Sequence, residues 1–460
     1  MRLYSEIALA LATALFLTAC KNTVIGEGRN KPEAAPLMEA NVPSRLQLPL
    51  PSAAPLAAEL NRGATTEQAP PRVKLTPPAG IENRTRVAIL LPLSGGRAEL
   101  GRAVLDAAKL AFFELADSDF ELRPYDTAAT GQGAANAAER AVADGVKLVI
   151  GPIYSAAVLG AAPIVRNAGL NMLAFSNNRL VAEPGVYLSG LSPESQIERV
   201  ISYAAQRGVR QLGVLTPRGA FGDRVLETAR RAAGKARIAI VRSEKFGPAT
   251  DDIARAVHTI GNYDVRRAAL LKQKRALAKR QDEVSKRALA RLKILDTLGP
   301  VSFDALVVAT SGEDLLKMAA QLGNFDIDTK RVRLLGLASW AAEGTGREPA
   351  LVGGWFATPP AARDNDFARN FRAIYEKEPH PLGANAYDLV ALAAILSSQE
   401  GGAKYDKATL TSPTGFAGIS GLFRFLPNGL SERGLEVREV TPGGSKMIDQ
   451  ALKNFKLREN

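Results

Sequence analysis

From residue 86 onward, short apolar runs typical of strands alternate with stretches that have the apolar spacing of helices. Short apolar runs predict three buried strands, at residues 87–93, 147–153 and 171–175. Stretches with helical spacing alternate with these runs, such as 101–115 and 134–143. In the first stretch Leu100, Val104 and Ala107 recur every three to four residues, which is typical of an amphipathic helix. The pattern predicts alternating strands and helices.

The same alternation resumes in the second half of the chain. Further elements are predicted as strands over 211–216, 238–241 and 303–310 and as a helix over 223–233. A repeated strand–helix series favours mainly parallel sheets with right-handed crossovers. Because about 370 residues exceed what one hydrophobic core usually covers, we expect an α/β fold of two lobes.

The first twenty residues have the pattern of a secretion signal. Arg2 and the α-amino group precede an apolar run at 7–17, which is too short to span a bilayer. The run ends in Leu-Thr-Ala-Cys at positions 17–20, which resembles the lipobox of bacterial lipoproteins. Cys20 is the only cysteine of the chain and therefore has no disulfide partner within it. We expect a signal peptide over 1–19 and lipid attachment at Cys20.

The resemblance to lipoproteins also implies a location. Two or three acyl chains anchor a protein stably, whereas one chain gives only marginal membrane binding. The residue after the expected cleavage site is Lys21 rather than Asp. In the sorting rule of enterobacterial lipoproteins this favours the periplasmic face of the outer membrane over the inner membrane. The alternative interpretation is an ordinary signal peptide in which Cys20 occurs by chance.

The segment that follows lacks the pattern of a folded domain. Ten prolines lie between residues 21 and 84, with few aromatic residues and no sustained periodicity. This composition predicts a disordered, lipid-anchored linker over 20–84. As a coil such a linker would span roughly 45 Å, and as polyproline II up to about 200 Å.

The positive charge of the chain is concentrated in one segment. Residues 265–293 hold eleven Lys and Arg against two acids, while the formal charge of the whole chain is +12. We therefore expect no nucleic-acid partner, and a basic helical insertion in lobe two over 265–298. Its apolar face is predicted to comprise Leu277, Val284, Ala288, Leu292 and Leu295.

This basic insertion has two interpretations. One is a solvated helix or helical hairpin. The other is a docking surface for an acidic partner or an anionic envelope polymer. The candidate docking residues are Lys272, Lys274, Arg275, Lys279 and Arg280.

Most catalytic chemistries lack the residues that they need. The chain has two histidines, His258 and His380, and its one cysteine is expected to carry lipid. The sequence has no G-x-S-x-G elbow, no Walker A stretch and no G-x-G-x-x-G after a strand. We expect no catalytic residue, metal or cofactor. An enzyme acting on cell-wall glycan or peptide remains an alternative, because carboxylate spacing alone does not identify a glycosidase.

An ordered series of motifs resembles the type I periplasmic binding proteins, which include the Leu/Ile/Val-binding proteins. The motifs are Arg86–Gly95, Leu148–Pro152 with Ser155, Ala174–Asn177, Gly213–Leu215 followed by Ala220–Gly222, and Gly418–Gly421. The resemblance covers about 85–445 and implies two lobes, each a mainly parallel sheet flanked by helices. We expect lobe one to comprise 85–191 and 340–405, and lobe two 192–339 and 412–450.

Two stretches are most similar to the lipoprotein activators of penicillin-binding proteins (LpoA/LppC type). These stretches are Leu191–Glu194 and Pro217–Gly222. The resemblance implies a lipoprotein that binds a bifunctional penicillin-binding protein and stimulates its transpeptidase. The enterobacterial type has a helical-repeat N-terminal domain where this chain has the Pro-rich linker, so the activating contact does not transfer. The alternative is a substrate-binding lipoprotein of an amino-acid-type ABC transporter.

Polar residues follow several of the predicted strands. They are Ser94, Ser155, Ser176, Asn177 and Ser311. Ligands of parallel α/β sheets bind at the carboxyl ends of the strands. Amino-acid-binding relatives use hydroxyls and amides at several such positions. Phe221 is expected either to cover a ligand or to fill a closed cleft. We expect a small amino-acid-like or cell-wall-derived ligand; the alternative is that these residues are helix caps and turn residues.

Overall fold

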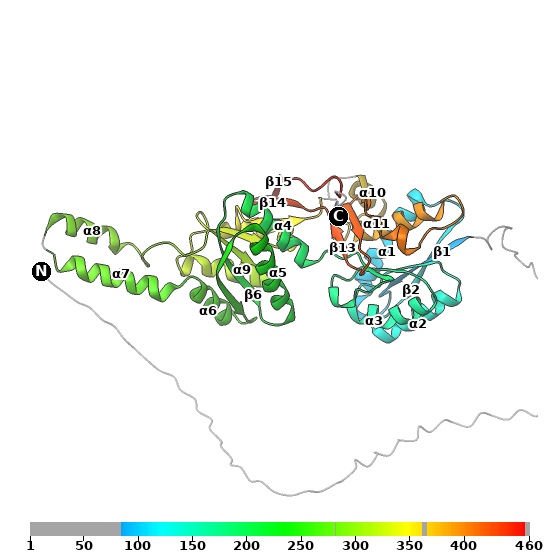
Figure 1. Cartoon of the computed structure of the whole chain (residues 1–460), viewed down its shortest axis with the longest axis horizontal. Coiled ribbons are helices and arrows are strands. Elements are labelled where there is room, and N and C mark those ends of the chain that lie inside the picture. The colour runs from blue at the N-terminus through cyan, green and yellow to red at the C-terminus, as the bar shows by residue number, and fades with distance from the viewer. Residues whose placement is uncertain (1–83, 281, 361–365, 456–460) are drawn as a thin grey trace, which may run out of the picture. The chain divides into compact units, whose positions relative to one another are not determined.

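The computed structural model describes residues 84–280, 282–360 and 366–455 (Figure 1). The expected signal peptide, Cys20 and nearly all of the linker lie outside these residues, and those expectations stay predictions. Within the described ranges, no helix is long and apolar enough to cross a membrane.

Lobe one contains a five-stranded parallel sheet with the strand order β2-β1-β3-β4-β5. Its strands are β1 (Thr85–Leu91), β2 (Phe120–Asp126), β3 (Leu148–Ile150), β4 (Met172–Ala174) and β5 (Val186–Leu188). The helices of this lobe are α1 (Ala98–Leu115), α2 (Gly131–Ala143), α3 (Ser155–Asn167), α10 (Asp366–Tyr375), α11 (Gly383–Ser397) and α12 (Lys407–Leu410).

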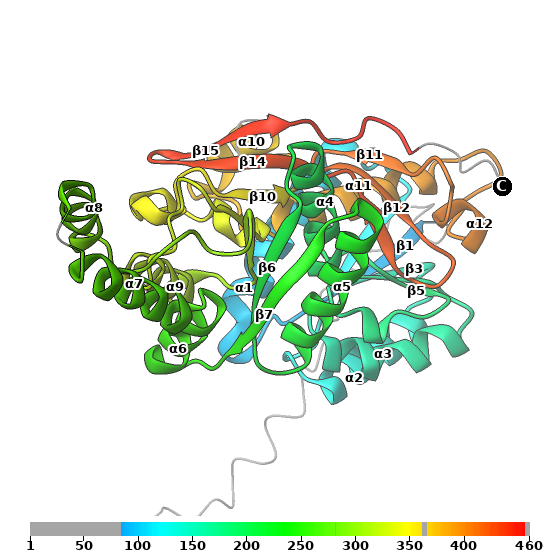
Figure 2. The same cartoon turned by 60° about the vertical axis from the view of Figure 1, so that its left-hand side comes forward.

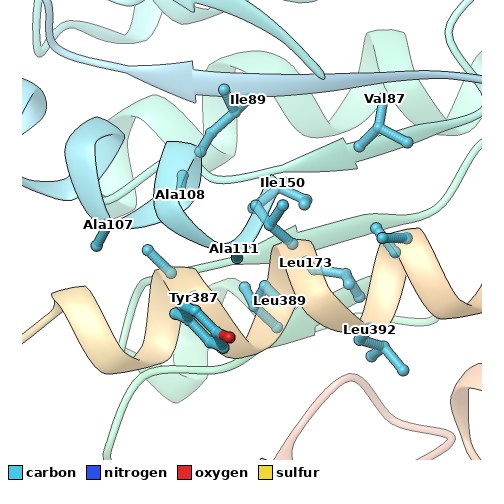
Figure 3. Packing of buried hydrophobic residues seen from close by; sticks show 14 of the residues in the cluster. Val87, Ile89, Ala107, Ala108, Ala111, Ile150, Leu173, Tyr387, Leu389 and Leu392 are labelled. Atoms are coloured by element: carbon cyan, nitrogen blue, oxygen red, sulfur yellow. The ribbon is translucent and has the colours of Figure 1, made fainter. Parts of the chain in front are cut away.

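Both faces of this sheet are buried because its side chains alternate between two apolar cores. Val87 and Ile89 of β1 pack with α1 and α11 in one core, part of which is drawn in Figure 3. Ala88 and Leu90 point to the other face and pack against α2 and α3. A parallel strand buried on both sides has a continuous apolar sequence, which is what the run over 87–91 predicts.

Lobe two contains a seven-stranded sheet with the order β15-β14-β10-β9-β8-β6-β7. Its strands are β6 (Gln211–Pro217), β7 (Ala239–Phe246), β8 (Ala305–Val308), β9 (Arg333–Gly336), β10 (Trp355–Thr358), β14 (Glu436–Thr441) and β15 (Gly444–Asp449). Neighbouring strands are parallel from β7 through β6, β8 and β9 to β10. At the other edge, β14 is antiparallel to β10, and β15 is antiparallel to β14. The helices of this lobe are α4 (Pro193–Gln206), α5 (Ala220–Ala236), α6 (Thr250–Ile260), α7 (Tyr263–Ala278), α8 (Glu283–Lys293) and α9 (Gly312–Asn324).

The lobe boundaries differ from the expected ones in two places. β10 was expected in lobe one, but it pairs with β9 and β14, and the buried Trp340 and Leu351 pack in the lobe-two core. In contrast, Phe423 and Phe425 were expected in lobe two and pack in the lobe-one core. These two phenylalanines lie on β12 (Gly421–Phe425), the middle strand of a small sheet with β11 (Phe416–Gly418) and β13 (Ser431–Arg433). Apolar periodicity predicts strands but does not assign them to a sheet.

The basic insertion is a hairpin of α7 and α8, which lie side by side beyond α6 (Figure 1, Figure 2). The five residues expected on one apolar face therefore do not share a helix: Leu277 lies on α7, three lie on α8, and Leu295 follows α8. Val284 is exposed, whereas Leu277 and Leu292 are partly buried. A single helical period does not continue through the turn that follows Lys279. After this turn, Asp282 caps the start of α8 by accepting from the Ser285 backbone N–H at 2.8 Å.

Candidate functional site

Two of the expected ligand-facing serines lie together at the carboxyl edge of the lobe-one sheet. Ser155 is the first residue of α3, directly after β3, and Ser176 follows the neighbouring strand β4. Their Oγ atoms are 3.2 Å apart. Ser176 is buried, and its Oγ also accepts from the Asn178 backbone N–H at 3.2 Å. This pair offers hydroxyl groups at the N-terminus of a helix, a position that favours anions.

The backbone at the end of β3 requires a glycine. Gly151 has a φ of 87°, and a Cβ there would lie 2.4 Å from the carbonyl oxygen of Leu90 in the adjacent strand β1. Only a residue without a side chain fits both constraints. The glycine thereby lets the chain turn directly from β3 towards Ser155.

Ser94 lies at the same edge but is engaged in a turn. Its backbone N–H donates to Asp126 Oδ1 at 3.2 Å, as do the backbone N–H groups of Leu93 and Ala128, both at 2.8 Å. Burial alone would raise the pKa of Asp126, but these hydrogen bonds and one from the Ser94 hydroxyl outweigh it and lower the pKa. Within the described residues, no hydrogen bond joins Ser94 to Ser155 or Ser176.

The two candidate residues of lobe two, Phe221 and Ser311, lie at or near the starts of helices. Phe221 is partly buried and packs against the core formed by α4 and α5. Ser311 is exposed at the N-cap of α9, and its side chain makes no capping hydrogen bond. The described contacts do not link either residue to the serines of lobe one. The structure therefore brings together Ser155 and Ser176 but not the whole expected set.

Asn177 lines a cavity of about 780 Å³ beside the segments that cross between the lobes. Its apolar lining consists of Leu188, Leu426, Leu430, Leu452 and Phe455. Five arginines also line it, namely Arg179, Arg199, Arg231, Arg424 and Arg433. A cavity of this volume is within the range of small-molecule sites.

Most of the charges in this cavity are paired. Arg424 donates to Glu432 Oε2 at 2.8 Å and 2.5 Å, and its guanidinium lies 4.4 Å from the ring centroid of Phe455. Arg231 pairs with Glu198 at 3.0 Å. The side chain of Arg179 is exposed and forms no hydrogen bond or ion pair with any described residue. The cavity thus combines apolar walls with one cation that is free to bind an anion.

Arg433 connects the lobe crossings. Its Nη2 donates to the carbonyl oxygen of Ser189 at 2.7 Å and to Asn385 Oδ1 at 2.6 Å, and its Nη1 donates to Ser420 Oγ at 3.0 Å. The chain first crosses from lobe one to lobe two after β5, and Ser189 begins this first crossing. It crosses to lobe two for the last time between β13 and β14; Arg433 ends β13 and so lies at this third crossing. Burial lowers the pKa of Arg433, and the charge of Asp388 opposes this effect.

Two further groups fix the same region. Asp388 accepts from the backbone N–H groups of Ile419 at 2.7 Å and Ser420 at 3.1 Å. Burial raises the pKa of Asp388, although these hydrogen bonds and Arg433 act in the opposite direction. On the lobe-two side, Arg199 of α4 donates to the carbonyl oxygen of Leu435 at 2.9 Å. The third crossing is therefore held at both ends.

The rings of both histidines contact neighbouring residues of the fold. His258 Nε2 lies 3.1 Å from Asp264 Oδ1, and its ring packs edge-on against Phe325. His380 Nδ1 accepts from the Leu382 backbone N–H at 3.1 Å, and burial lowers its pKa. The part of the chain that the structure describes contains no group of three or more His, Cys, Asp or Glu residues placed to hold a metal ion.

Sequence reasoning did not identify the arginines of the cavity. Arg199 lies on α4, which is far in the sequence from β12 and β13, where Arg424 and Arg433 lie. Ser189 and Arg433 are separated by 244 positions. The small-residue stretch Ser189–Gly190 after a buried strand is the one local signal of a crossing, and a Cβ on Gly190 would lie 2.5 Å from the Phe175 carbonyl oxygen.

These features define a two-lobed α/β protein with a pair of serines at the edge of one sheet and a cavity beside the lobe crossings. The sequence profile of the family described as "Periplasmic binding protein" matches residues 84–427, which is more than half of the chain. The chain belongs to this periplasmic binding protein family.

Curated relatives match over part of their length. An uncharacterised protein of Rickettsia prowazekii (strain Madrid E) is 23% identical over 181 residues, which cover 39% of this chain and 48% of that protein. The penicillin-binding protein activator LpoA of Pectobacterium parmentieri (strain WPP163) is 32% identical over 133 residues, which cover 28% of this chain and 19% of that protein. The matches thus span less than half the length of either relative.

Solved structures share the fold. The branched-chain amino acid ABC transporter periplasmic ligand-binding protein from Burkholderia xenovorans LB400 aligns with a TM-score of 0.59 and 17% sequence identity. The alignment covers 79% of this chain and 94% of that protein. At this identity the likeness concerns the fold alone.

Proposed function

We propose that this protein is a lipid-anchored lipoprotein of the outer membrane, facing the periplasm, that binds a bifunctional penicillin-binding protein and activates peptidoglycan synthesis without catalysing a reaction itself. The partial similarity to LpoA activators is the observation that carries this proposal. The lipobox-like sequence ending at Cys20 supports the anchor. Activation would be allosteric: docking favours the active state of the synthase by the difference in its affinity for the two states.

The basic hairpin supplies a candidate docking surface for this partner. On α7, Lys272, Arg275 and Lys279 lie on the helix face opposite to the partly buried Leu277, and Arg280 follows in the turn. These four cations form no ion pair with a described residue. Lys274 differs, because its Nζ donates to the carbonyl oxygen of Leu295 at 3.4 Å and joins the two helices. We therefore assign docking to Lys272, Arg275, Lys279 and Arg280.

Affinity purification from crosslinked cell envelopes tests the proposal. The chain is expected to recover a bifunctional penicillin-binding protein, and replacing the four docking cations by Gln is expected to reduce the recovery at least tenfold. The matched control is the Lys147→Gln, Arg230→Gln, Lys235→Gln, Lys404→Gln variant, which removes four other exposed cations. Equal recovery with both variants would exclude the hairpin, and absence of any synthase would contradict the proposal.

The alternative function is a substrate-binding lipoprotein of an amino-acid-type ABC transporter. The cavity of about 780 Å³ and the Ser155–Ser176 pair favour a small anionic or amino-acid-like ligand. A ligand present at 100 times its Kd stabilises a protein by about 2.7 kcal/mol. A thermal-shift screen of amino acids and cell-wall fragments therefore distinguishes the functions. A large shift with one amino acid, abolished by Ser155→Ala, would favour transport.

A further inference from the structure

The outer face of α8 carries apolar and cationic side chains together. Val284, Arg287 and Arg291 recur at intervals of three and four residues along α8 and therefore share one face of it. Ile294 lies beside them. Val284 is 77% exposed and Ile294 is 85% exposed, which is unusual for large aliphatic side chains. The buried Ser285 lies off this face.

The cations on this face are unpaired. Among the described residues, neither Arg287 nor Arg291 forms a hydrogen bond or ion pair through its side chain. Glu283, the acid within α8, pairs instead with Lys286 at 2.9 Å. The face thus presents positive charge that no acid within the hairpin neutralises.

The hairpin is held firmly at its base, so this face has a fixed orientation on lobe two. Arg266 is buried and donates to the carbonyl oxygens of Gly261 at 2.9 Å and Phe325 at 2.8 Å. It also donates to Thr297 Oγ1 at 2.8 Å and to the Gly299 carbonyl oxygen at 3.2 Å. One side chain therefore ties the start of α7 to the segment after α8 and to the end of α9.

We propose that the outer face of α8 binds the surface of an anionic phospholipid bilayer. Basic helices with exposed aliphatic residues place the aliphatic groups at the boundary between headgroups and acyl chains, while the cations bind anionic headgroups. Cations also surround the hairpin on α7, with Lys272, Arg275 and Lys279 on its outer face. This inference goes beyond the proposed function and does not depend on it.

Vesicle co-sedimentation tests the proposal. The chain from Lys21 onward retains every described residue and carries no lipid. It is expected to bind phosphatidylcholine vesicles that contain roughly one third phosphatidylglycerol, but not vesicles of phosphatidylcholine alone. Arg287→Gln with Arg291→Gln is expected to reduce partitioning about 25-fold, because each cation near an anionic surface contributes about fivefold. Val284→Ser with Ile294→Ser is also expected to reduce it, in a manner that depends little on salt.

The matched control is Lys272→Gln with Arg275→Gln, which removes the same charge from α7. It is expected to reduce partitioning by less than the α8 charge pair. Failure of the unmodified chain to bind anionic vesicles, equal binding to neutral vesicles, or equal losses with the α7 and α8 charge pairs would each overturn the proposal. A chain that ignores vesicles but loses a protein partner with Arg287→Gln and Arg291→Gln would identify a protein-docking face instead.

Discussion

At the scale of single residues, the polar groups of lobe one are arranged around backbone turns. Asp388 of α11 holds the loop between β11 and β12 through the backbone N–H groups of Ile419 and Ser420. This carboxyl is buried, and burial raises its pKa. The hydrogen bonds that it accepts compensate for part of the cost of burying charge but do not remove it.

The raised pKa of Asp388 gives a prediction about pH. A carboxyl whose folded pKa exceeds its unfolded value contributes stability that is fully present below the unfolded pKa and is lost as the pH rises through the folded pKa. Asp388→Asn removes this dependence. From about pH 4 upward the native chain is therefore expected to lose stability relative to the variant, by up to about 1.4 kcal/mol per unit of raised pKa. Thermal unfolding followed by circular dichroism measures this difference, and a constant difference across the pH range would contradict the assignment.

The sequence pattern accounts for the proximity of some candidate residues but not for the contacts of others. Ser155 and Ser176 each follow a predicted strand, and their strands are adjacent and parallel, so their proximity follows from the pattern. Arg433 contacts a carbonyl oxygen 244 positions away, and the contact depends on how β13 packs against lobe one. Neither local propensity nor hydrophobic spacing contains that information.

At the scale of secondary-structure elements, the strand–helix alternation predicted the two parallel sheets. It did not assign β10 to lobe two or β12 to lobe one, because both strands are short and apolar, and the sheet or core that each one joins depends on tertiary contacts. It also predicted a helix or hairpin for 265–298 without locating the turn. The turn lies just before Asp282, which caps the start of α8. This capping residue is a local signal of a new helix, but the apolar spacing suggested one continuous helical face across it.

The base of this hairpin yields a stability prediction. Arg266→Met retains most of the aliphatic stem but leaves the carbonyl oxygens of Gly261 and Phe325 without this donor, and is expected to cost about 3 kcal/mol. Urea unfolding followed by tryptophan fluorescence measures the loss, because both tryptophans, Trp340 and Trp355, lie in lobe two. The exposed neighbour Arg267→Met is expected to change stability by less than about 0.5 kcal/mol. Equal effects would contradict the role of Arg266.

At the scale of the whole molecule, the lobes are connected by crossings that arginines hold on either side. Arg433 binds the first crossing and lobe-one groups, and Arg199 binds the start of β14 from lobe two. We infer that these arginines set how readily the crossings open locally.

Hydrogen exchange tests this inference. Arg433→Gln is expected to increase amide exchange about tenfold in residues 186–192 and 431–436, which corresponds to about 1.4 kcal/mol of local stability. Exchange in α2 and α3 is expected to stay unchanged. Arg424→Gln removes the pair with Glu432 but leaves the contact with Ser189 intact, and should not affect 186–192. Unchanged exchange in Arg433→Gln, or a uniform increase across lobe one, would contradict the inference.

The proposed function is tested most directly by reconstituted peptidoglycan synthesis. The purified chain is added to a bifunctional penicillin-binding protein from the same bacterium, and the crosslinked fraction of the product is measured. We predict saturable binding and an increased crosslinked fraction, both reduced when Lys272, Arg275, Lys279 and Arg280 are replaced by Gln. The account is contradicted if the chain neither binds the synthase nor changes crosslinking.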